Sequence, residues 1–312
     1  MFASRTSAEW QLRTRSLELG ARTLVMAVVN ITPDSFSDGG AFLDPQAAIA
    51  HTLQAFEEGA DIVDLGAEST RPGSRAGGAP GSAQAPAVSA EEEQARLLPV
   101  LEGILKAQPH AVLSVDTYKA ATARAALAAG AEIINDVSGF TWDPGIAAVC
   151  AEGRAGVVLT HTRGRPEEWR TQKRLDAEPL IALVREGLAE SLSRAARSGI
   201  PLLAMLLDPG YGFGKRFGEN FSLLSRQEEL LSLGRPLLAG VSRKSFLGHA
   251  LASLYGNVPA PVHDRETAGI AAMVATILNG ASIVRVHTVR PALEAALLAD
   301  AILAAGGRET NQ

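Results

Sequence analysis

The sequence predicts an α/β protein with the fold class of a (β/α)8 TIM barrel. Three observations support this prediction: short apolar runs recur along the chain, helical segments separate them, and polar residues follow the runs. Continuous apolar runs are typical of parallel strands that are buried on both faces. Eight strand-helix units within 312 residues fit a closed barrel, with a doubly wound sheet as the competing arrangement.

The expected elements follow one another from the N-terminus. Residues 1–22 form a short N-terminal extension, in which Trp10 to Leu19 alternates loosely and predicts a possible hairpin. Residues 23–305 carry the barrel, and residues 306–312 form a tail. The expected strands are residues 23–30, 61–66, 112–116, 132–136, 156–161, 202–207, 236–242 and 282–286.

Helix start signals stand between these strands. Asp44 followed by Pro45 predicts an N-cap and a first helical residue, and Ser89 with Glu92 predicts a capping box. Asp143 and Asp176 are interpreted as helix caps. Further helices are expected near residues 121–128 and over residues 177–197, 264–278 and 291–304.

One segment interrupts this regular order. Residues 74–88 are rich in Gly, Ala, Pro and Ser and can bury little apolar surface. We therefore expect an extended, mobile second βα loop at this point.

Composition restricts the class of protein. The net charge is −5 and the chain has no basic tract, so we expect no extended nucleic-acid partner. The single cysteine, Cys150, excludes an intramolecular disulfide framework and a cysteine metal cluster. Residues 268–284 are apolar but are broken by Asn279 and Gly280, which favours a helix and a strand over a membrane span. We expect a cytoplasmic protein.

The segment from Leu207 to Lys215 is the most informative. An apolar run ends at Asp208, and Gly210, Gly212 and Gly214 follow it. Alternating glycines let the backbone bend sharply and approach a ligand closely. A carboxylate in front of such a turn favours a binding site at the strand end.

Other polar residues follow the expected strands in the same way, and barrel active sites lie at that face. Asp116, Asn135 and Asp208 suit a flat heterocycle with a guanidine-like edge, because a carboxylate accepts two parallel N–H bonds. Lys244 could donate to a carbonyl or nitrogen of that ring. Arg285 and His287 favour an anion site.

A cation and several residues of ambiguous role complete this face. Asn30, with Asp38 or Asp34, offers oxygen ligands of the kind that Mg²⁺ prefers. Asp64 is interpreted as a buried cap, and His161 as equally consistent with a residue that stabilises its loop. The remaining histidines, interpreted as surface residues without partners, are His51, His110, His249 and His263.

These segments together resemble the dihydropteroate synthase family of the folate pathway, over nearly the whole chain. The resemblance is carried by residues 29–40, 68–73, 114–117, 134–136, 207–215, 240–246 and 285–287, in the family's order. It implies a transferase that joins 6-hydroxymethyl-7,8-dihydropterin diphosphate to 4-aminobenzoate and releases pyrophosphate. It also implies Mg²⁺ as cofactor, inhibition by sulfonamides and a homodimer.

The resemblance implies a role for each matching residue. The pterin would be bound by Asp116, Asn135, Asp208 and Lys244. The diphosphate would be bound by Asn30, Arg285 and His287, with Mg²⁺ held by Asn30 and Asp38. The 4-aminobenzoate site would be shaped by Phe36, Thr70, Arg71, Pro72, Phe213, Lys244 and Ser245. The residues that act in catalysis would be Asn30, Lys244, Arg285 and His287.

Three departures from the family pattern accompany the resemblance. Ala67 stands where glycine is usual, Thr160 and Thr162 flank His161 in place of methionine, and Thr288 replaces an aspartate. Two alternatives stay open: a pterin-dependent methyltransferase domain, which would not need the Thr70 loop, and a weakly active pterin-binding paralogue.

Overall fold

The computed structural model describes residues 6–32, 44–70 and 88–306 of the chain. The predicted closed barrel is confirmed, and the competing doubly wound sheet is wrong. Eight parallel strands are hydrogen-bonded in the cyclic order β10-β3-β4-β5-β6-β7-β8-β9. They are β3 (Leu24–Asn30), β4 (Ile62–Gly66), β5 (Leu113–Asp116), β6 (Ile133–Asp136), β7 (Gly156–Thr160), β8 (Met205–Asp208), β9 (Leu237–Ala239) and β10 (Ala281–Val286).

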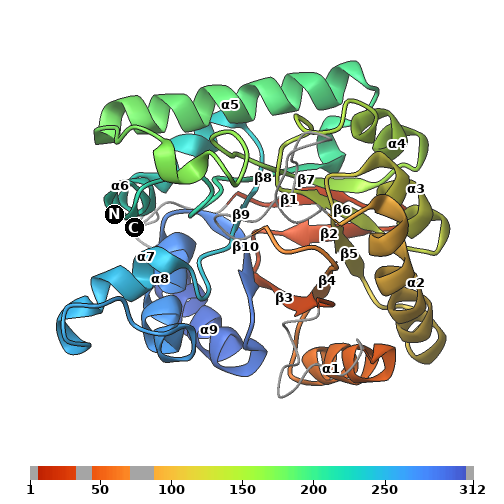
Figure 1. The fold of residues 1–312 in the computed structure, drawn as a ribbon, viewed down its shortest axis with the longest axis horizontal. Helices are drawn as coiled ribbons and strands as arrows, with labels where there is room; N and C mark the ends of the chain where they lie inside the picture. The colour runs from red at the N-terminus through yellow and green to blue at the C-terminus, as the bar shows by residue number, and fades with distance from the viewer. Residues whose placement is uncertain (1–5, 33–43, 71–87, 307–312) are drawn as a thin grey trace, which may run out of the picture.

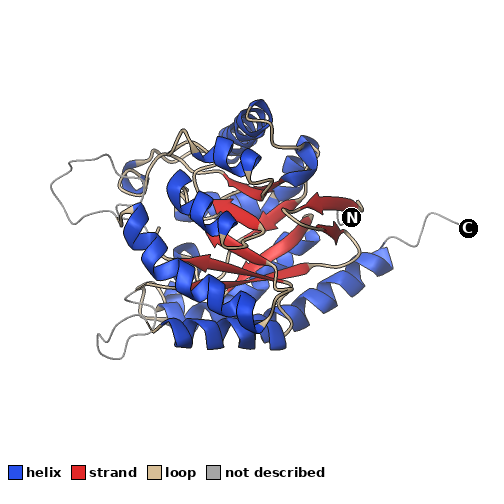
Figure 2. Cartoon of the chain, turned by 90° about the vertical axis from the view of Figure 1, so that its right-hand side faces the viewer, coloured by secondary structure: helices blue, strands red, loops and turns tan. Residues whose placement is uncertain are grey.

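Helices surround the barrel, as Figures 1 and 2 show. The α-helices of the described chain are α1 (Pro45–Glu57), α2 (Ala90–Ala107), α3 (Ala120–Ala128), α4 (Ile146–Glu152), α5 (Ala177–Arg197), α6 (Phe217–Ser225), α7 (Ser245–Ala250), α8 (Glu266–Leu278) and α9 (Val289–Gly306). Ser89 caps α2 as expected, because its hydroxyl accepts a hydrogen bond from the Glu92 amide at 3.1 Å.

Alternation along each strand decides which side chains enter the barrel, because successive side chains point to opposite faces. On β3, Val25, Ala27 and Val29 pack in the apolar layer under the helices, and Met26 packs inside the barrel. The same parity carries Asn30 to the inner face. On the inner face of each strand, the first side chains are therefore apolar, and the side chains that follow toward the carboxyl end belong to the site.

A hairpin closes the opposite end of the barrel. Strands β1 (Ala8–Gln11) and β2 (Ser16–Leu19) pair antiparallel. Trp10 is fully buried, packs with Met26 and Leu206, and donates from Nε1 to the Ala204 carbonyl at 3.0 Å. The hairpin thus covers the amino-terminal ends of the strands and leaves the carboxyl ends for ligands.

Two predicted helix caps act differently from the expectation. Helix α4 begins only at Ile146, and the Asp143 carboxylate accepts hydrogen bonds from the amides of Ala120 and Gly145, both at 2.8 Å. Asp143 therefore caps the start of α3, a neighbour that sequence spacing does not reveal. Asp176 stands at the N-cap of α5, but its side chain makes no capping hydrogen bond there.

One predicted strand is shorter than its apolar run. Residues Leu202–Ala204 form a 3₁₀ turn, and β8 begins at Met205. Leu202 and Leu203 are exposed, so the apolar run begins before the part of the chain that enters the sheet. The apolar pattern marks hydrophobic residues but does not show where hydrogen bonding to the next strand begins.

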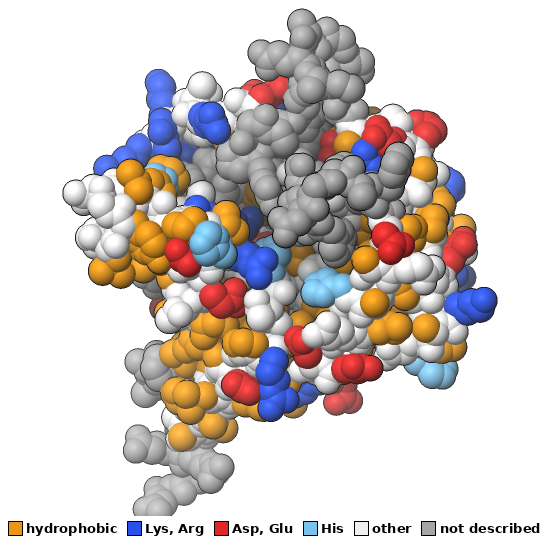
Figure 3. Space-filling view, turned by 60° about the horizontal axis from the view of Figure 1, so that its bottom comes forward, with side chains coloured by type: hydrophobic (Ala, Val, Ile, Leu, Met, Phe, Trp, Pro, Cys, Tyr) orange, Lys and Arg blue, Asp and Glu red, His pale blue; other side chains and the backbone are white. Residues whose placement is uncertain are grey.

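The surface of the described chain is of mixed charge. Figure 3 shows Lys and Arg side chains interspersed with Asp and Glu side chains over one face. Within the described residues, every helix is too short or too polar to cross a lipid bilayer.

Candidate active site

A hollow lies at the carboxyl ends of the strands, where the inner polar residues converge. It brings together four residues that sequence analysis assigned to one heterocycle, and it adds Arg285. The lining consists of Asp116, Asn135, Val137, Thr160, Asp208, Phe213, Gly240, Lys244 and Arg285. Acceptors and cations therefore share one small enclosed space.

Arg285 of β10 lines this hollow and pairs with acids of β4 and β5. Its Nε donates to Asp64 Oδ2 at 2.6 Å, and its Nη2 donates to Asp116 Oδ2 at 2.9 Å. Asn135 Nδ2 donates to the same Asp64 oxygen at 2.9 Å. The interpretation of Asp64 as a buried cap is wrong, since this carboxylate instead links Arg285 to Asn135.

Burial shifts the protonation of the lining groups. Burial raises the pKa of Asp116 to about 7, against the lowering effect of the Arg285 charge. Burial also raises the pKa of Asp208, against the Gly210 hydrogen bond and the nearby Lys244 charge. Burial lowers the pKa of Lys244 to about 8. Groups whose pKa values approach neutrality in a hollow are typical of functional sites.

The glycine turn after β8 fixes Asp208. The Gly210 amide donates to Asp208 Oδ1 at 2.7 Å. Gly210 has φ +72°, and a Cβ added there would lie 1.9 Å from the His161 carbonyl oxygen. Only glycine fits this approach, so the turn and the loop after β7 touch through their backbones.

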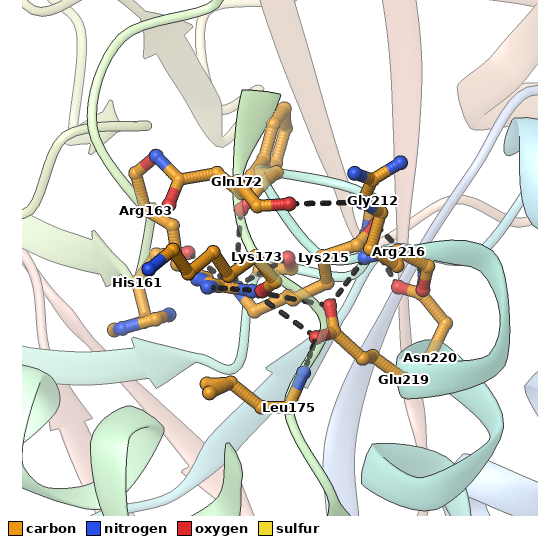
Figure 4. Close-up of polar contacts among 12 residues, drawn as sticks. His161, Arg163, Gln172, Lys173, Leu175, Gly212, Lys215, Arg216, Glu219 and Asn220 are labelled. Carbon is orange, nitrogen blue, oxygen red and sulfur yellow. Dashed lines mark hydrogen bonds and ion pairs between the residues drawn. The ribbon is translucent and has the colours of Figure 1, made fainter. Parts of the chain in front are cut away.

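A buried lysine joins the same two loops. Lys215 Nζ donates to the carbonyls of His161 and Gly210, both at 2.8 Å, and to that of Phe213 at 3.4 Å. Figure 4 shows this ammonium between the two loops. Lys215 has no contact with the hollow and instead holds the Gly210 turn in place.

An ion pair continues this support toward the start of α6, as Figure 4 also shows. Arg163 Nη1 lies 3.2 Å from Glu219, and Glu219 also accepts from the Leu175 amide at 2.6 Å. The contacts hold the loop that carries Phe213. The Phe213 ring packs on Trp169 at 5.3 Å, and Lys244 Nζ lies 3.6 Å from its centre.

The other two predicted anion residues lie at the carboxyl ends of β3 and β10. His287 follows the end of β10, and its Nδ1 lies 3.0 Å from Ser242 Oγ. Asn30 ends β3, and its side-chain oxygen lies 3.8 Å from the position of a Cβ on Gly66. Gly66 pairs with Asn30 on one side and Asp116 on the other, so the missing side chain leaves room between them.

The predicted aminobenzoate residues are placed only in part. Ser245 is the exposed first residue of α7, directly after Lys244, and Thr70 is half-buried at the end of a described segment. Phe36, Arg71 and Pro72 lie outside the described residues, as do Asp34, Asp38 and most of the 74–88 segment.

Comparison with known proteins agrees with this site. The family described as Pterin binding enzyme matches residues 26–287. The dihydropteroate synthase of Bacillus subtilis is 38% identical over 292 residues, which cover 94% of this chain and 93% of that protein. The chain belongs to the dihydropteroate synthase family.

Solved structures of the family share the fold closely. The Xanthomonas albilineans dihydropteroate synthase with 4-aminobenzoic acid superposes with a TM-score of 0.81 at 39% identity, covering 96% of this chain and 99% of that one. The Yersinia pestis synthase in its sulfonamide drug complex gives a TM-score of 0.83 at 35% identity, covering 95% and 99%.

The departures from the family pattern fall at defined places. Thr160 lines the hollow directly. Ala67 is buried, and its carbonyl accepts from Arg96 Nη1 at 3.1 Å. The Thr288 hydroxyl accepts from Arg243 Nη2 at 3.3 Å. Among these departures, Thr160 is the one that lines the hollow formed by the described residues.

The histidines outside the anion site separate into one buried ring and four exposed ones. His161 is buried, and Gly187 of α5 makes room for it, since a Cβ there would lie 2.6 Å from its ring. The exposed histidines are His51, His110, His249 and His263. His249 nevertheless stacks on Phe217 with ring centres 3.5 Å apart, and His263 Nε2 lies 3.5 Å from Asp264 Oδ1, so the expectation that these two have no partner is wrong.

Sequence reasoning placed Asp64 at this face but interpreted it as a cap, and it did not single out Ser242. Both residues occupy positions that the sequence pattern could have pointed to. Asp64 has the inner-face parity of its strand, two residues before Gly66, and Ser242 precedes the Arg243-Lys244-Ser245 run. Parity alone could have placed Asp64 inside the barrel.

Proposed function

We propose that this chain catalyses the dihydropteroate synthase reaction. It joins 6-hydroxymethyl-7,8-dihydropterin diphosphate to 4-aminobenzoate and releases pyrophosphate. The observation that carries the proposal is the convergence of Asp116, Asn135, Asp208 and Lys244 in one hollow beside Arg285. Membership of the family and the similarity to synthases that hold 4-aminobenzoic acid and sulfonamide support the same activity.

The pterin occupies the hollow in this proposal. Its guanidine-like edge carries adjacent N–H groups, which one carboxylate can accept in parallel. Asp208 is buried and oriented by the Gly210 amide, and since each carboxylate oxygen can accept more than one hydrogen bond, both oxygens can still accept from the ring. Asn135 and Asp116 pair the opposite edge, and Lys244 donates to the ring carbonyl or nitrogen.

The diphosphate lies above Arg285. Asp64 and Asp116 engage Nε and Nη2 of this side chain and so orient the guanidinium plane. Oriented guanidinium groups bind phosphate with high geometric specificity. His287, whose ring is held by Ser242, and Asn30 complete the anion site.

The chemistry then needs no side-chain nucleophile. When the C–O bond to pyrophosphate breaks, positive charge develops on the pterin methylene, and the electron-rich ring delocalises it. The amine nitrogen of aminobenzoate forms the new C–N bond and then loses a proton. Fixed charges that stabilise the leaving anion and hold the amine in line supply the catalysis.

The aminobenzoate packs at the mouth of the hollow. Phe213 and Lys244 form one stacked wall, and Ser245 follows at the start of α7. Thr70, together with Phe36, Arg71 and Pro72, supplies the other wall in this proposal. Sulfonamides, which mimic aminobenzoate in shape and charge, would compete for the same place.

Magnesium is the proposed cofactor. Mg²⁺ is usually bound by one or two protein oxygens and by phosphate oxygens. Asn30 and Asp38 would hold the ion, which would neutralise the leaving diphosphate.

A homodimer is the proposed assembly. Apolar side chains are exposed along and after α6 and α7, and they include Phe217, Phe221, Leu254, Val258 and Val262. Large exposed apolar side chains that gather on one side favour contact with another protein. Light scattering after gel filtration should give twice the mass of one chain. In Phe221→Asp, the measured mass should fall to that of a single chain.

A cytoplasmic location is proposed as well. It is supported by the single, buried Cys150, which provides no disulfide framework. Fractionation of cells that express the full protein should recover it with cytosolic markers.

The activity is tested by measuring pyrophosphate release with both substrates present and with each omitted in turn. Release that requires both substrates and stops on chelation of Mg²⁺ is expected. Methyl transfer from methyltetrahydrofolate without pyrophosphate release would instead support the methyltransferase alternative. Pterin binding without turnover would support a paralogue.

A further inference from the structure

The second βα loop leaves the barrel after β4 and returns at α2. Its two described ends, residues 67–70 and 88–93, are here called the loop stem. Lys119, which directly precedes α3, reaches both ends of the stem. Its Nζ contacts Glu68, just after β4, and lies 3.0 Å from Glu93 in the first turns of α2.

This contact is largely buried. The exposed fractions of the three side chains are 13% for Lys119, 7% for Glu68 and 1% for Glu93. Thr122 Oγ1 donates to Glu93 Oε2 at 2.8 Å, and the Lys119 ammonium lies 4.5 Å from the Tyr118 ring centre. Burial lowers the pKa of Lys119, but the charges of Glu93 and Glu68 outweigh it and hold that pKa above its ordinary value.

A buried ion pair is a poor way to gain stability, because desolvation offsets most of the attraction. It is an effective way to fix geometry, because each charge must meet its partner. Here one ammonium meets acids from both ends of the same loop. The arrangement therefore restrains the distance and direction between those ends.

A second cation makes a parallel tie. Arg96 of α2 donates from Nη1 to the Ala67 carbonyl at 3.1 Å and pairs through Nη2 with Glu92. Lys119 differs from Arg96 in coming from a third segment, the loop after β5. That loop follows Asp116, the last residue of β5, and its Tyr118 packs with Val137 in a cluster that Phe213 also touches.

We propose that Lys119 is a positioning residue that clamps the two ends of the second βα loop and thereby sets where Thr70 lies relative to the hollow. Thr70 follows Glu68 by two residues, so a shift of Glu68 moves Thr70 with it. The pterin residues Asp116, Asn135 and Asp208 lie on strands, and within the described chain Lys119 makes its ion pairs with Glu68 and Glu93 rather than with them. The proposal rests on the synthase function and assigns Lys119 to the aminobenzoate half of the site.

The test separates the two substrates. Lys119→Met removes the charge and keeps most of the length of the side chain. We expect the KM for 4-aminobenzoate to rise about tenfold, since small misplacements far from the reacting atoms have effects of this size. Pterin affinity, measured by calorimetry, should stay within about twofold, well below a tenfold change of about 1.4 kcal/mol. Lys119→Arg keeps the positive charge, so its KM for 4-aminobenzoate should stay close to the wild-type value.

A matched control comes from the same helix region. Arg124 of α3 forms an exposed ion pair with Glu152, at 62% and 61% exposure, and does not touch the loop stem. Arg124→Met should leave both substrates unaffected. Glu68→Gln provides a second, milder break of the clamp if Lys119→Met fails to fold, and should raise the KM for aminobenzoate in the same way.

An unchanged KM for aminobenzoate in folded Lys119→Met or Glu68→Gln would overturn the proposal. So would equal losses for pterin and aminobenzoate, because these would show a general structural role. Failure of the synthase function itself would be seen earlier, as wild-type protein that releases no pyrophosphate.

Discussion

Arg285 has two acidic partners that come from neighbouring strands of the barrel. Asp64 of β4 and Asp116 of β5 hold the guanidinium, and Asn135 of β6 joins the same network. Asp64 Oδ1 is buried without a hydrogen bond among the described residues. A buried carboxylate of this kind is tolerated because the adjacent guanidinium charge offsets its desolvation.

Asp64→Asn should destabilise the fold, because it leaves the buried Arg285 charge with one acid instead of two. Losing one partner of a buried pair costs about 3–5 kcal/mol in the free energy of unfolding. Urea denaturation measures this value. Glu152→Gln, which breaks an exposed pair, should change it by less than about 1 kcal/mol. Equal effects of the two changes would contradict the central role of Asp64.

Asp208→Asn should weaken pterin binding while the protein stays folded. The carboxylate would lose its charge and one of its two acceptors for the paired N–H groups of the pterin. The loss of a hydrogen bond to a charged group costs about 1.5–3 kcal/mol. Calorimetric titration with a pterin measures it, and circular dichroism checks the fold. Wild-type affinity in the folded variant would remove Asp208 from the pterin site.

The pH dependence follows from two shifted groups. Burial raises the pKa of Asp116 to about 7 and lowers the pKa of Lys244 to about 8. Binding needs the ionised carboxylate and the charged ammonium, so kcat/KM for the pterin substrate should rise with pH through 7 and fall through 8. In Asp116→Asn the residual activity should lack the acidic limb. A profile flat from pH 6 to about 9 would contradict this assignment.

The elements that carry the site are short turns whose geometry depends on glycine and on buried cations. The turn after β8 has positive φ at Gly210, Gly212 and Gly214. Lys215 and the Arg163–Glu219 pair then tie this turn to the loop after β7. Two loops from neighbouring strands thus form one rigid wall under Phe213.

Gly210→Ala should test this wall. The residue has φ +72° and lies against the His161 carbonyl, whereas Gly234 has a similar φ of +70° with no atom within 4 Å. Gly234→Ala should therefore cost only the conformational strain of about 1–2 kcal/mol. Gly210→Ala should cost clearly more and should also weaken pterin binding. Thermal unfolding of the two variants gives the comparison, and equal costs would show that the loop contact is easily displaced.

The whole molecule is a barrel that is closed at one end and functional at the other. The β1–β2 hairpin covers the amino-terminal ends of the strands, and the polar inner residues lie at the carboxyl ends. The two ends share the same strands, so stability contributed at the hairpin supports the geometry of the site.

Trp10→Ala should therefore destabilise the entire barrel. Trp10 is fully buried and also makes the hydrogen bond to Ala204. Truncation of a buried tryptophan costs about 3–5 kcal/mol. Ser16→Ala on the exposed part of the same hairpin should change the free energy of unfolding by less than about 0.5 kcal/mol. A small loss in Trp10→Ala would show that the barrel is stable without its cover.

The sequence by itself determined the barrel and much of its site. Eight apolar runs predicted the strands. Because Asp116, Asn135, Asp208 and Lys244 lie at or just after the ends of such runs, the sequence also predicted that they would meet. This succeeds because strand period and chain direction are local properties: in a parallel barrel they send every strand end to one face.

Only the tertiary structure decided which strands are neighbours at each level of the barrel. It showed that Asp64 is a partner of Arg285 instead of a cap and that Asp143 caps the start of α3. It also showed that Lys119 lies between Glu68 and Glu93. These pairs are separated by 221, 23, 51 and 26 positions in the chain. Contacts at such separations depend on strand register and helix packing, which no local pattern of residues specifies.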